Sequence, residues 1–385
     1  MDAREIFEEL GVTGSAYAAP IAGTGSGAVP GGVERENEAR TTGVSGLGEG
    51  RARGRAPSAF DGGESAPPAG ASVSGAGASR AGNSETRASG TGAGREHGAA
   101  AFGGVGVEAD RPMSPASVAK VQVALAVEDA IAAGTLDGRE QRILAADRRT
   151  PGPTGISLSR DEVRMSVRDL VVQMLTISDN VATDELLTLV GVRRVNELTA
   201  RLGMRGTRIT GDLRSVLDDM AREAGFGGYP ALAAHDPAAG PSPAEVRQSL
   251  HTSAALDPAR GWATTAADTV TLLRAIWTDT AAAPAACANV REAMSRQLTR
   301  HRIAAGFGPE VAVAAKSGGL MGLVRNEAAV VTFPGAARYA VAVFTRSTPD
   351  TPTDPARIDA GIGRVARALI DRLRADTGAG GAERA

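Results

Sequence analysis

The stretch SPASVAKVQVALAVEDAIAAG, residues 114–134, combines a helix start with a candidate reactive pair. Ser114 fits an N-cap and Pro115 fits the first helical position, and apolar residues then recur at helical spacing. Ser117 and Lys120 are three positions apart on one face of this helix, so the hydroxyl and the amine can meet. The serine also lies in the first turn, where unpaired N–H groups and the helix dipole favour a developing oxyanion.

The chain has 42 basic residues, of which only Lys120 and Lys316 are lysines. Arginine stays charged at any working pH, whereas a buried lysine can lose its proton and act as a base. A chain that uses arginine almost everywhere, but lysine at these two positions, is therefore expected to need the chemistry of lysine there.

A second candidate motif is Ser178-Asp179-Asn180, within MLTISDNVATDELL at 174–187 and between two predicted helices. The Ser178 hydroxyl could relay a proton to a leaving nitrogen, and the Asn180 amide could hold a substrate amide. Asp and Asn are also common at helix caps, so this triplet alone is equally consistent with a simple helix break.

A third candidate motif, Lys316-Ser317-Gly318, opens KSGGLMGLVRNEAAVV at 316–331. Lys316 would place a positive charge beside the second hydroxyl, and Ser317 could bind a substrate carboxylate. Gly318 would let a substrate backbone approach the strand edge, because it has no side chain. The N–H of Gly319 could pair with that of the first serine to form an oxyanion hole.

The three motifs, in this order, resemble the signature of the class A β-lactamases and penicillin-binding proteins. The resemblance extends from about residue 103 to 370 and is expected to include the first 21 residues. It implies a serine hydrolase that forms an acyl-enzyme with a β-lactam or a related amide or ester. It also implies a β-lactamase/transpeptidase-like fold with the active site at the junction of its two parts.

The resemblance also implies a role for each motif residue. Ser117 would be the nucleophile, Lys120 a base and Ser178 the proton relay. Asn180 would anchor both substrate and Lys120, and Lys316 would be an electrostatic anchor. Arg325 resembles the arginine that some class A enzymes use for the substrate carboxylate, with a solvated strand arginine as the alternative reading.

One part of the class A pattern is missing. Class A enzymes carry a glutamate in an E-x-x-L-N loop after S-D-N, which activates the water that releases the acyl-enzyme. Here the corresponding stretch is GDLRSVLDDMAREAG, and the segment from Gly225 to Arg260 is longer than the usual connection. The candidate carboxylates are Asp212, Asp218, Asp219 and Glu223, and an exposed helical position is the expected environment of each.

Three interpretations of function follow. The chain could be a working β-lactamase with a different water activator, or a penicillin-binding-like or esterase-like hydrolase that releases its adduct slowly. The third alternative is a catalytically degenerate scaffold that binds a ligand or partner without turnover, although the two retained lysines argue against it.

The elements expected from periodicity give an α+β fold, with one antiparallel sheet, flanking terminal helices and a helical subdomain. We expect helices at 3–10, 166–176, 180–190, 192–202, 212–224, 243–251, 265–279 and 358–375, and strands at 15–21, 104–109, 311–317, 324–333 and 338–345. Residues 1–21 and 101–376 would form the catalytic domain. Residues 22–100, rich in Gly, Ala and Ser, would be a disordered insertion between two paired strands, and 377–385 a disordered tail.

Other functions have little support in the sequence. The net charge of −2 gives no field for nucleic acid, and aromatic residues, at 3%, are too few for a base-stacking platform. The four histidines and the lone Cys287 lack metal-ligand spacing, so we expect a small-molecule substrate and no metal or cofactor. The sequence shows no membrane span and no signal peptide, so a cytoplasmic location is the expectation.

Overall fold

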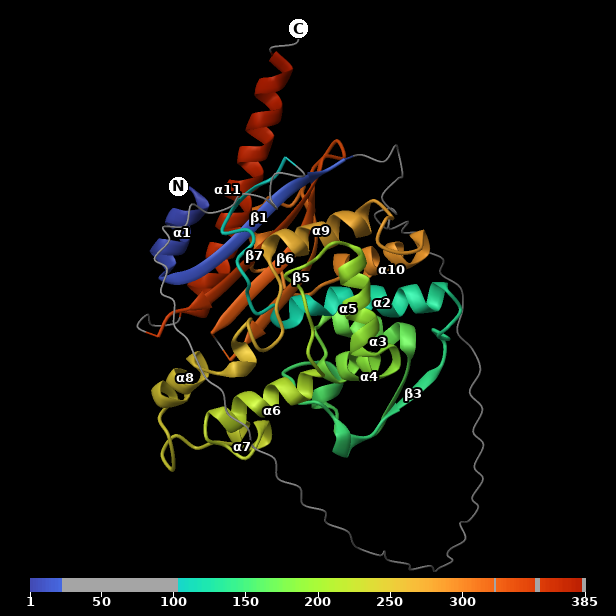
Figure 1. The fold of residues 1–385 in the computed structure, drawn as a ribbon, viewed down its shortest axis with the longest axis vertical. Helices are drawn as coiled ribbons and strands as arrows, with labels where there is room; N and C mark the ends of the chain where they lie inside the picture. The colour runs from blue at the N-terminus through green and yellow to red at the C-terminus, as the bar shows by residue number, and fades with distance from the viewer. Residues whose placement is uncertain (23–102, 322, 350–353, 383–385) are drawn as a thin grey trace, which may run out of the picture. The chain divides into compact units, whose positions relative to one another are not determined.

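The computed structural model describes residues 1–22, 103–321, 323–349 and 354–382. Its main sheet has five antiparallel strands in the order β2-β1-β7-β6-β5 (Figure 1). The strands are β1 Val12–Ile21, β2 Val105–Val107, β5 Ala312–Leu320, β6 Val324–Thr332 and β7 Arg338–Ser347. Strand β5, which carries the third motif, lies at one edge of this sheet, so one side of it is open to other elements.

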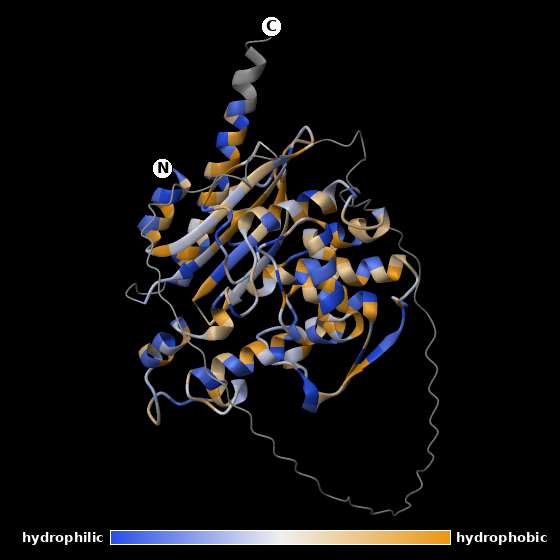
Figure 2. Ribbon diagram, viewed as in Figure 1, coloured by the Kyte–Doolittle hydropathy of each residue, from blue (hydrophilic) through white to orange (hydrophobic). Residues whose placement is uncertain are grey.

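Successive side chains in each strand point to opposite faces of the sheet, and helices cover both faces. On one face, α1 (Ala3–Leu10) and α11 (Pro355–Ala382) pack on side chains such as Val341 and Val343. On the other, α9 (Ala266–Trp277) packs with Ala342 and Phe344. In Figure 2, hydrophobic and hydrophilic residues alternate around α11, as expected for a helix with one buried face. The expected α+β architecture is confirmed.

The helical body lies between β2 and β5 in the chain. Its helices are α2 Lys120–Ala132, α3 Val167–Thr176, α4 Asn180–Val190, α5 Val192–Arg201, α6 Leu213–Glu223, α7 Tyr229–Ala233, α8 Pro243–His251 and α10 Pro284–Ser295. A separate two-stranded sheet pairs β3 (Gln141–Leu144) with β4 (Val163–Ser166). Helix α2 is buried nearly all round, which fits its position in the centre of this body.

Several sequence expectations need correction. Helix α10 and the short α7, β3 and β4 were not expected, because alanine-rich or very short segments give weak periodicity. Ser114 is not an N-cap: Ala116–Ala119 forms a 3-10 turn whose cap is Pro115, and α2 starts only at Lys120. The expected tail at 377–385 is in part helical, since α11 continues to Ala382 with no proline to stop it.

The first strand has the partner that the sequence suggested: Ala16 pairs with Val107 and Ala18 with Val105. The proposed disordered insertion at 22–100 lies, apart from residue 22, outside the described residues. The domain boundaries stay a prediction. Within the described ranges, no helix is both long and apolar enough to cross a bilayer.

The segment from Ile209 to Trp262 forms a long excursion that is closed at its base. Arg208 and Ala263 form an antiparallel bridge there, and the Arg208 guanidinium donates to the Gly261 carbonyl oxygen at 3.2 Å. Inside the excursion, apolar residues of α6 and α8 pack against Ala116 and the turn between β5 and β6. The excursion therefore borders the turn that carries Ser117.

Candidate active site

Ser117 lies in the 3-10 turn that leads into α2, at the point where the helical body meets β5. The preceding residue, Ala116, has a φ of 46°, which is uncommon for a residue with a side chain. Gly318 of β5 packs directly beneath this turn: a Cβ there would lie 3.1 Å from the Ser117 nitrogen. The absent side chain of Gly318 thus makes room for the Ser117 turn, rather than for a substrate backbone as the sequence suggested.

Lys120 follows one turn later and is fully buried. Its ammonium donates to the Ser178 carbonyl oxygen at 2.7 Å, to Asn180 Oδ1 at 2.8 Å and to Ser178 Oγ at 3.2 Å. Burial lowers the pKa of Lys120 to about 7, although the carboxylates of Asp179 and Asp184 oppose the shift. A lysine with this pKa is neutral often enough at pH 7 to accept a proton.

The second motif forms the connection from α3 to α4. Ser178 has a φ of 64°, and this left-handed conformation aims both of its oxygens at Lys120. Asp179 is fully buried and caps α4 by accepting from the Ala182 N–H at 2.9 Å. The Asn180 amide also donates to the Pro151 carbonyl oxygen at 2.7 Å. Strained residues that persist in such a setting are typical of functional sites.

Lys316, the other lysine, is also fully buried, and its ammonium donates to the Ser317 carbonyl oxygen at 2.8 Å. Burial and the like charge of Lys120 lower the pKa of Lys316 well below its ordinary value, whereas the Glu327 carboxylate opposes this. The expected contact of Lys316 with the Ser178 hydroxyl is not among the hydrogen bonds of the described residues, nor is one between Ser117 and Lys120 side chains. The two amines nevertheless influence each other electrostatically, because the charge of Lys120 contributes to the lowered pKa of Lys316.

Residues 98–373 match the β-lactamase enzyme family. The chain belongs to this family. It is 33% identical over 283 residues to the β-lactamase regulatory protein BlaB of Streptomyces cacaoi, across 70% of this chain and 88% of that protein.

Two solved structures have the same fold. A β-lactamase from Sphaerobacter thermophilus has a TM-score of 0.54 and 24% identity, covering 70% of this chain and 86% of its own. The structure of PBP-A has a TM-score of 0.54 and 20% identity, covering 70% and 85%. The expected β-lactamase/transpeptidase-like fold is therefore confirmed, while the roles of individual residues in this β-lactamase-family chain stay predictions.

Arg325 lies on β6 opposite Gly319 and is held by Asp359 of α11. Its Nε donates to Asp359 Oδ1 at 2.6 Å, and its Nη2 contacts Oδ2. Only 18% of the side chain is exposed, so the alternative reading as a solvated strand arginine is wrong. The adjacent Ser317 is buried, whereas Gly319 at the strand edge is exposed.

A group of buried polar residues that was not expected from the sequence holds β5 through hydrogen bonds to its backbone. The Gln297 side chain accepts from the Ser317 N–H and donates to Glu327 Oε1 at 3.1 Å. Arg302 donates to Asp359 Oδ1 at 2.8 Å and to the Gly318 carbonyl oxygen at 2.8 Å. A signal was present: Asn326 and Glu327 are polar residues within the mostly buried strand β6, and buried polar residues are expected to have hydrogen-bond partners.

The four candidate carboxylates of the Ile209–Trp262 excursion all have structural partners. Asp212 caps α6 by accepting from the Ser215 N–H, and Asp218 accepts from the Tyr229 N–H. Asp219 pairs with Arg222, and Glu223 accepts from the Ser253 hydroxyl. Three of them are exposed, as expected, and Asp218 is half-buried. None is hydrogen-bonded to Ser117 or Lys120 in the described structure.

The start of α6 is fixed by Asp184 of α4. Asp184 accepts from the backbone N–H of Leu213 at 2.7 Å and of Arg214 at 3.0 Å, and from the Thr150 hydroxyl at 2.6 Å. The first turn of α6 therefore lies against the helix that follows the second motif. This is where the sequence order would place a water-activating glutamate, and the residues present there are Leu213 and Arg214.

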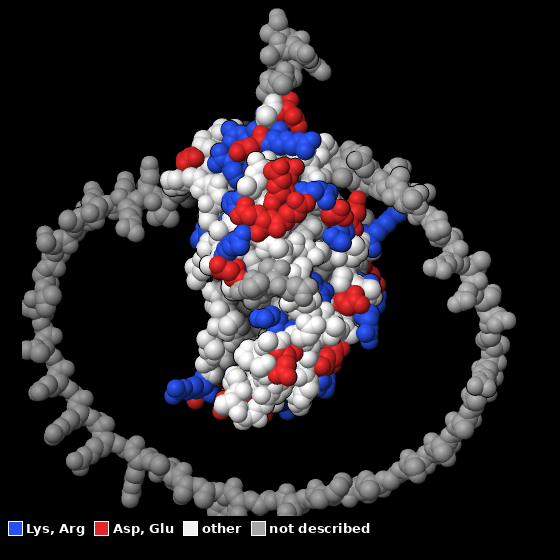
Figure 3. Space-filling model, turned by 90° about the vertical axis from the view of Figure 1, so that its left-hand side faces the viewer, with Lys and Arg blue, Asp and Glu red and all other residues white. Residues whose placement is uncertain are grey.

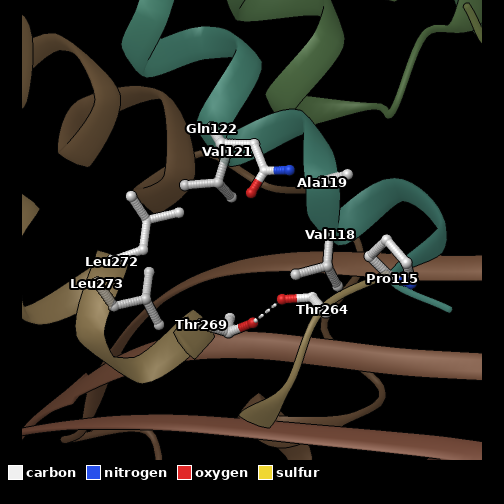
Figure 4. A pocket seen from close by; sticks show the side chains of 9 residues that line it. All are labelled: Pro115, Val118, Ala119, Val121, Gln122, Thr264, Thr269, Leu272 and Leu273. Atoms are coloured by element: carbon white, nitrogen blue, oxygen red, sulfur yellow. Dashed lines mark hydrogen bonds between the residues drawn. The ribbon is translucent and has the colours of Figure 1, made fainter. Parts of the chain in front are cut away.

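A small cavity of about 10 Å³ lies next to the 3-10 turn that carries Ser117, between α2 and α9 (Figure 4). Val118 and Leu273 line it, and Gln122 Nε2 is buried there without a hydrogen-bond partner. The space suits about one water molecule, so it is too small for a substrate.

Proposed function

We propose that this chain is a penicillin-recognising serine hydrolase. A β-lactam, or a related amide or ester, acylates Ser117, and the acyl group is then released slowly by hydrolysis. The observation that carries the proposal is the environment of Lys120. Its buried amine has a pKa of about 7, lies one turn from Ser117 and is held against Ser178 and Asn180. A side chain placed in this way can take the proton of an attacking hydroxyl.

In this mechanism the neutral Lys120 amine accepts the Ser117 proton while Oγ attacks the carbonyl carbon of the ligand. The N–H groups of Ser117 and Gly319 would bind the oxyanion. Ser178 would pass a proton to the departing nitrogen, with the positive charge of Lys316 nearby. Arg325, already oriented by Asp359, would attract the carboxylate that β-lactams carry.

Slow release is inferred from the Ile209–Trp262 excursion. Hydrolysis of an acyl-enzyme needs an activated water, and the candidate carboxylates there are already occupied in caps, turns and ion pairs. A long-lived adduct suits detection of β-lactams better than their destruction. The name of the BlaB relative, a β-lactamase regulatory protein, is in keeping with such a role. A cytoplasmic location belongs to the same proposal.

Intact-protein mass spectrometry tests this proposal. Full-length protein is mixed with benzylpenicillin, and the mass is followed from seconds to hours. We expect a single adduct with the mass of the whole penicillin that persists over many minutes, and a nitrocefin assay that gives a burst without sustained turnover. Sustained nitrocefin hydrolysis would instead identify a working β-lactamase, and no adduct at any time would leave only the binding scaffold.

A further inference from the structure

A second cavity, of about 150 Å³, lies at one end of the main sheet. One side of it is a row of the strand register, in which Arg346 of β7 lies between Thr13 of β1 and Val324 of β6. Residues directly opposite one another in neighbouring strands point to the same face, so these three side chains lie side by side. Residues 111–114 and Pro258 of the excursion form the other sides. A cavity of about this volume can hold a benzene-sized molecule.

This cavity lies on the opposite face of the sheet from the side chain of Arg325. Arg325 directly follows Val324 in β6, so the two side chains point to opposite faces, and Arg325 contacts Asp359 of α11. The Arg346 guanidinium instead donates to two backbone carbonyl oxygens of the excursion, at 2.7 and 3.0 Å. A ligand in this cavity would therefore not take the place proposed for the β-lactam carboxylate.

Positive charge predominates around the cavity, because two guanidinium groups and no carboxylate line it. Arg111 is exposed, and its side chain has no ion pair or hydrogen bond with any residue that the structure describes. Arg346 is half-buried and uses only part of its N–H donors on the excursion. Asp257 offsets some of this charge, but its carboxylate accepts from the Ala259 N–H at 2.8 Å and is not part of the lining.

The hydroxyl of Ser114 is also available, since the residue is not the helix cap that the sequence suggested. Ser114 is only 7% exposed, and its carbonyl oxygen accepts from Asn326 Nδ2 at 2.9 Å. Its hydroxyl has no hydrogen-bond partner within the described part of the chain. Beside it, the buried side chains of Met113 and Val324 make the lining partly apolar. The cavity thus combines cations and a free hydroxyl with apolar surface, as small-molecule sites do.

We propose that this cavity is a second ligand site, which binds a small organic carboxylate with an apolar body. The carboxylate would pair with Arg111 and Arg346, because guanidinium groups match the geometry of carboxylates. The apolar body would lie against Met113 and Val324. This inference goes beyond the proposed function, because the ligand would neither react with the nucleophile nor occupy its substrate site.

Methionine-methyl NMR tests the proposal, because Met113 lines the cavity. Full-length protein labelled with ¹³C at the methionine methyl groups is titrated with benzoate, and Met113→Leu assigns the signal. We expect a saturable shift with a dissociation constant of about 1 mM, which is ordinary for so small a ligand. Benzamide, which has nearly the same shape but no charge, and inorganic phosphate, which has no apolar body, should each bind at least about tenfold more weakly. No shift at about 20 mM benzoate, or equal binding of either comparison compound, would overturn the proposal.

Arg111→Gln should weaken benzoate binding about tenfold, because it removes a charged donor. Arg111 is exposed, so this variant should fold, and circular dichroism checks it. Arg205→Gln is the matched control: Arg205 is another exposed arginine with no ion pair to a described residue, and its loss should leave binding within about twofold. Unchanged binding by Arg111→Gln would contradict the proposal.

Arg325→Gln tests whether the two sites are separate. It should leave the benzoate shift of Met113 unchanged, because Arg325 points to the other face of the sheet. Loss of the shift in this variant would place the ligand in the site proposed for the β-lactam carboxylate, and the second site would be refuted. No β-lactam is used, so this titration and the acylation of Ser117 can each fail while the other succeeds.

Discussion

The residues around Ser117 and those of the Ile209–Trp262 excursion make the same kinds of contacts, but with different consequences. Around Ser117, polar groups are buried and their hydrogen bonds converge on two amines. In the excursion, the carboxylates are mostly exposed, and each is engaged in a helix cap, a hydrogen bond or an ion pair. The first arrangement shifts pKa values, and the second stabilises helices. The comparison favours the proposed acylation of Ser117, and the candidate carboxylates of the excursion are already engaged in other contacts.

The surface adds little to this comparison. The face shown in Figure 3 carries acidic and basic side chains interspersed, in keeping with the small net charge. Such a surface creates no strong long-range field, so recognition of a ligand must depend on the local charges at the edge of β5.

Loss of the nucleophile should have the largest effect. Ser117→Ala removes the atom that forms the bond, so labelling by a fluorescent penicillin should disappear completely on a denaturing gel. Ser215→Ala is the matched control, because Ser215 also lies in the first turn of a helix but is exposed. Undiminished labelling of Ser117→Ala would remove the assignment of the nucleophile.

Loss of the base should have the next largest effect. Lys120→Arg keeps a positive charge but cannot accept a proton, so the acylation rate should fall by about 10²–10⁴-fold. In the unmodified protein the neutral amine is the active form. Since the pKa of Lys120 is about 7, the rate should fall about tenfold per unit as the pH drops below 7 and level off above it.

Labelling rates measured from pH 5 to pH 9 check this prediction. Circular dichroism at each pH serves as the control for folding. A rate that is flat across this range, or an arginine variant as fast as the parent, would show that Lys120 acts only through its charge.

Loss of Arg325, the residue proposed to bind the ligand carboxylate, should have a smaller effect. A charged hydrogen bond to a ligand contributes about 1.5–3 kcal/mol, so Arg325→Ala should lower the second-order acylation rate about tenfold or more. Arg222→Ala removes another arginine that is paired with a carboxylate, on the exposed side of α6, and should have no effect. The idea fails if Arg325→Ala retains the rate of the parent to within twofold.

The three motifs could be recognised because each is a short pattern of residue types, and the scarcity of lysine marks both amines. The helical spacing expected for Ser117 and Lys120 was only approximate, because Ser117 lies in the 3-10 turn before α2. The overall fold was predictable for a similar reason, since its longest helices and strands have clear periodicity. The left-handed conformation of Ser178 was not predictable, because serine seldom adopts it.

The supporting residues could not be assigned from sequence, because their partners come from remote elements. Asp359 of α11 meets Arg302 and Arg325, and Gln297, just beyond α10, meets Glu327 of β6. Local patterns do not encode such pairings. Helices α7 and α10 were not predicted either, because glycine- and alanine-rich segments show little amphipathic periodicity.

The smallest expected effect concerns the excursion, and it bears most directly on the comparison. If its carboxylates only hold turns and caps, then Asp212→Asn, Asp218→Asn, Asp219→Asn and Glu223→Gln should each change the lifetime of the penicillin adduct by less than about threefold, far below the 10²–10⁴-fold expected for a general base. The same variants should lose at most about 1 kcal/mol of stability, with the Asp212 cap losing most.

Adduct lifetimes come from mass spectra after free penicillin is removed, and stabilities from urea unfolding. A variant whose adduct lasts tenfold longer than that of the parent, without loss of stability, would identify the missing water activator. The excursion would then supply the hydrolytic half of the reaction through a residue that has to move toward Ser117 once the acyl group is in place.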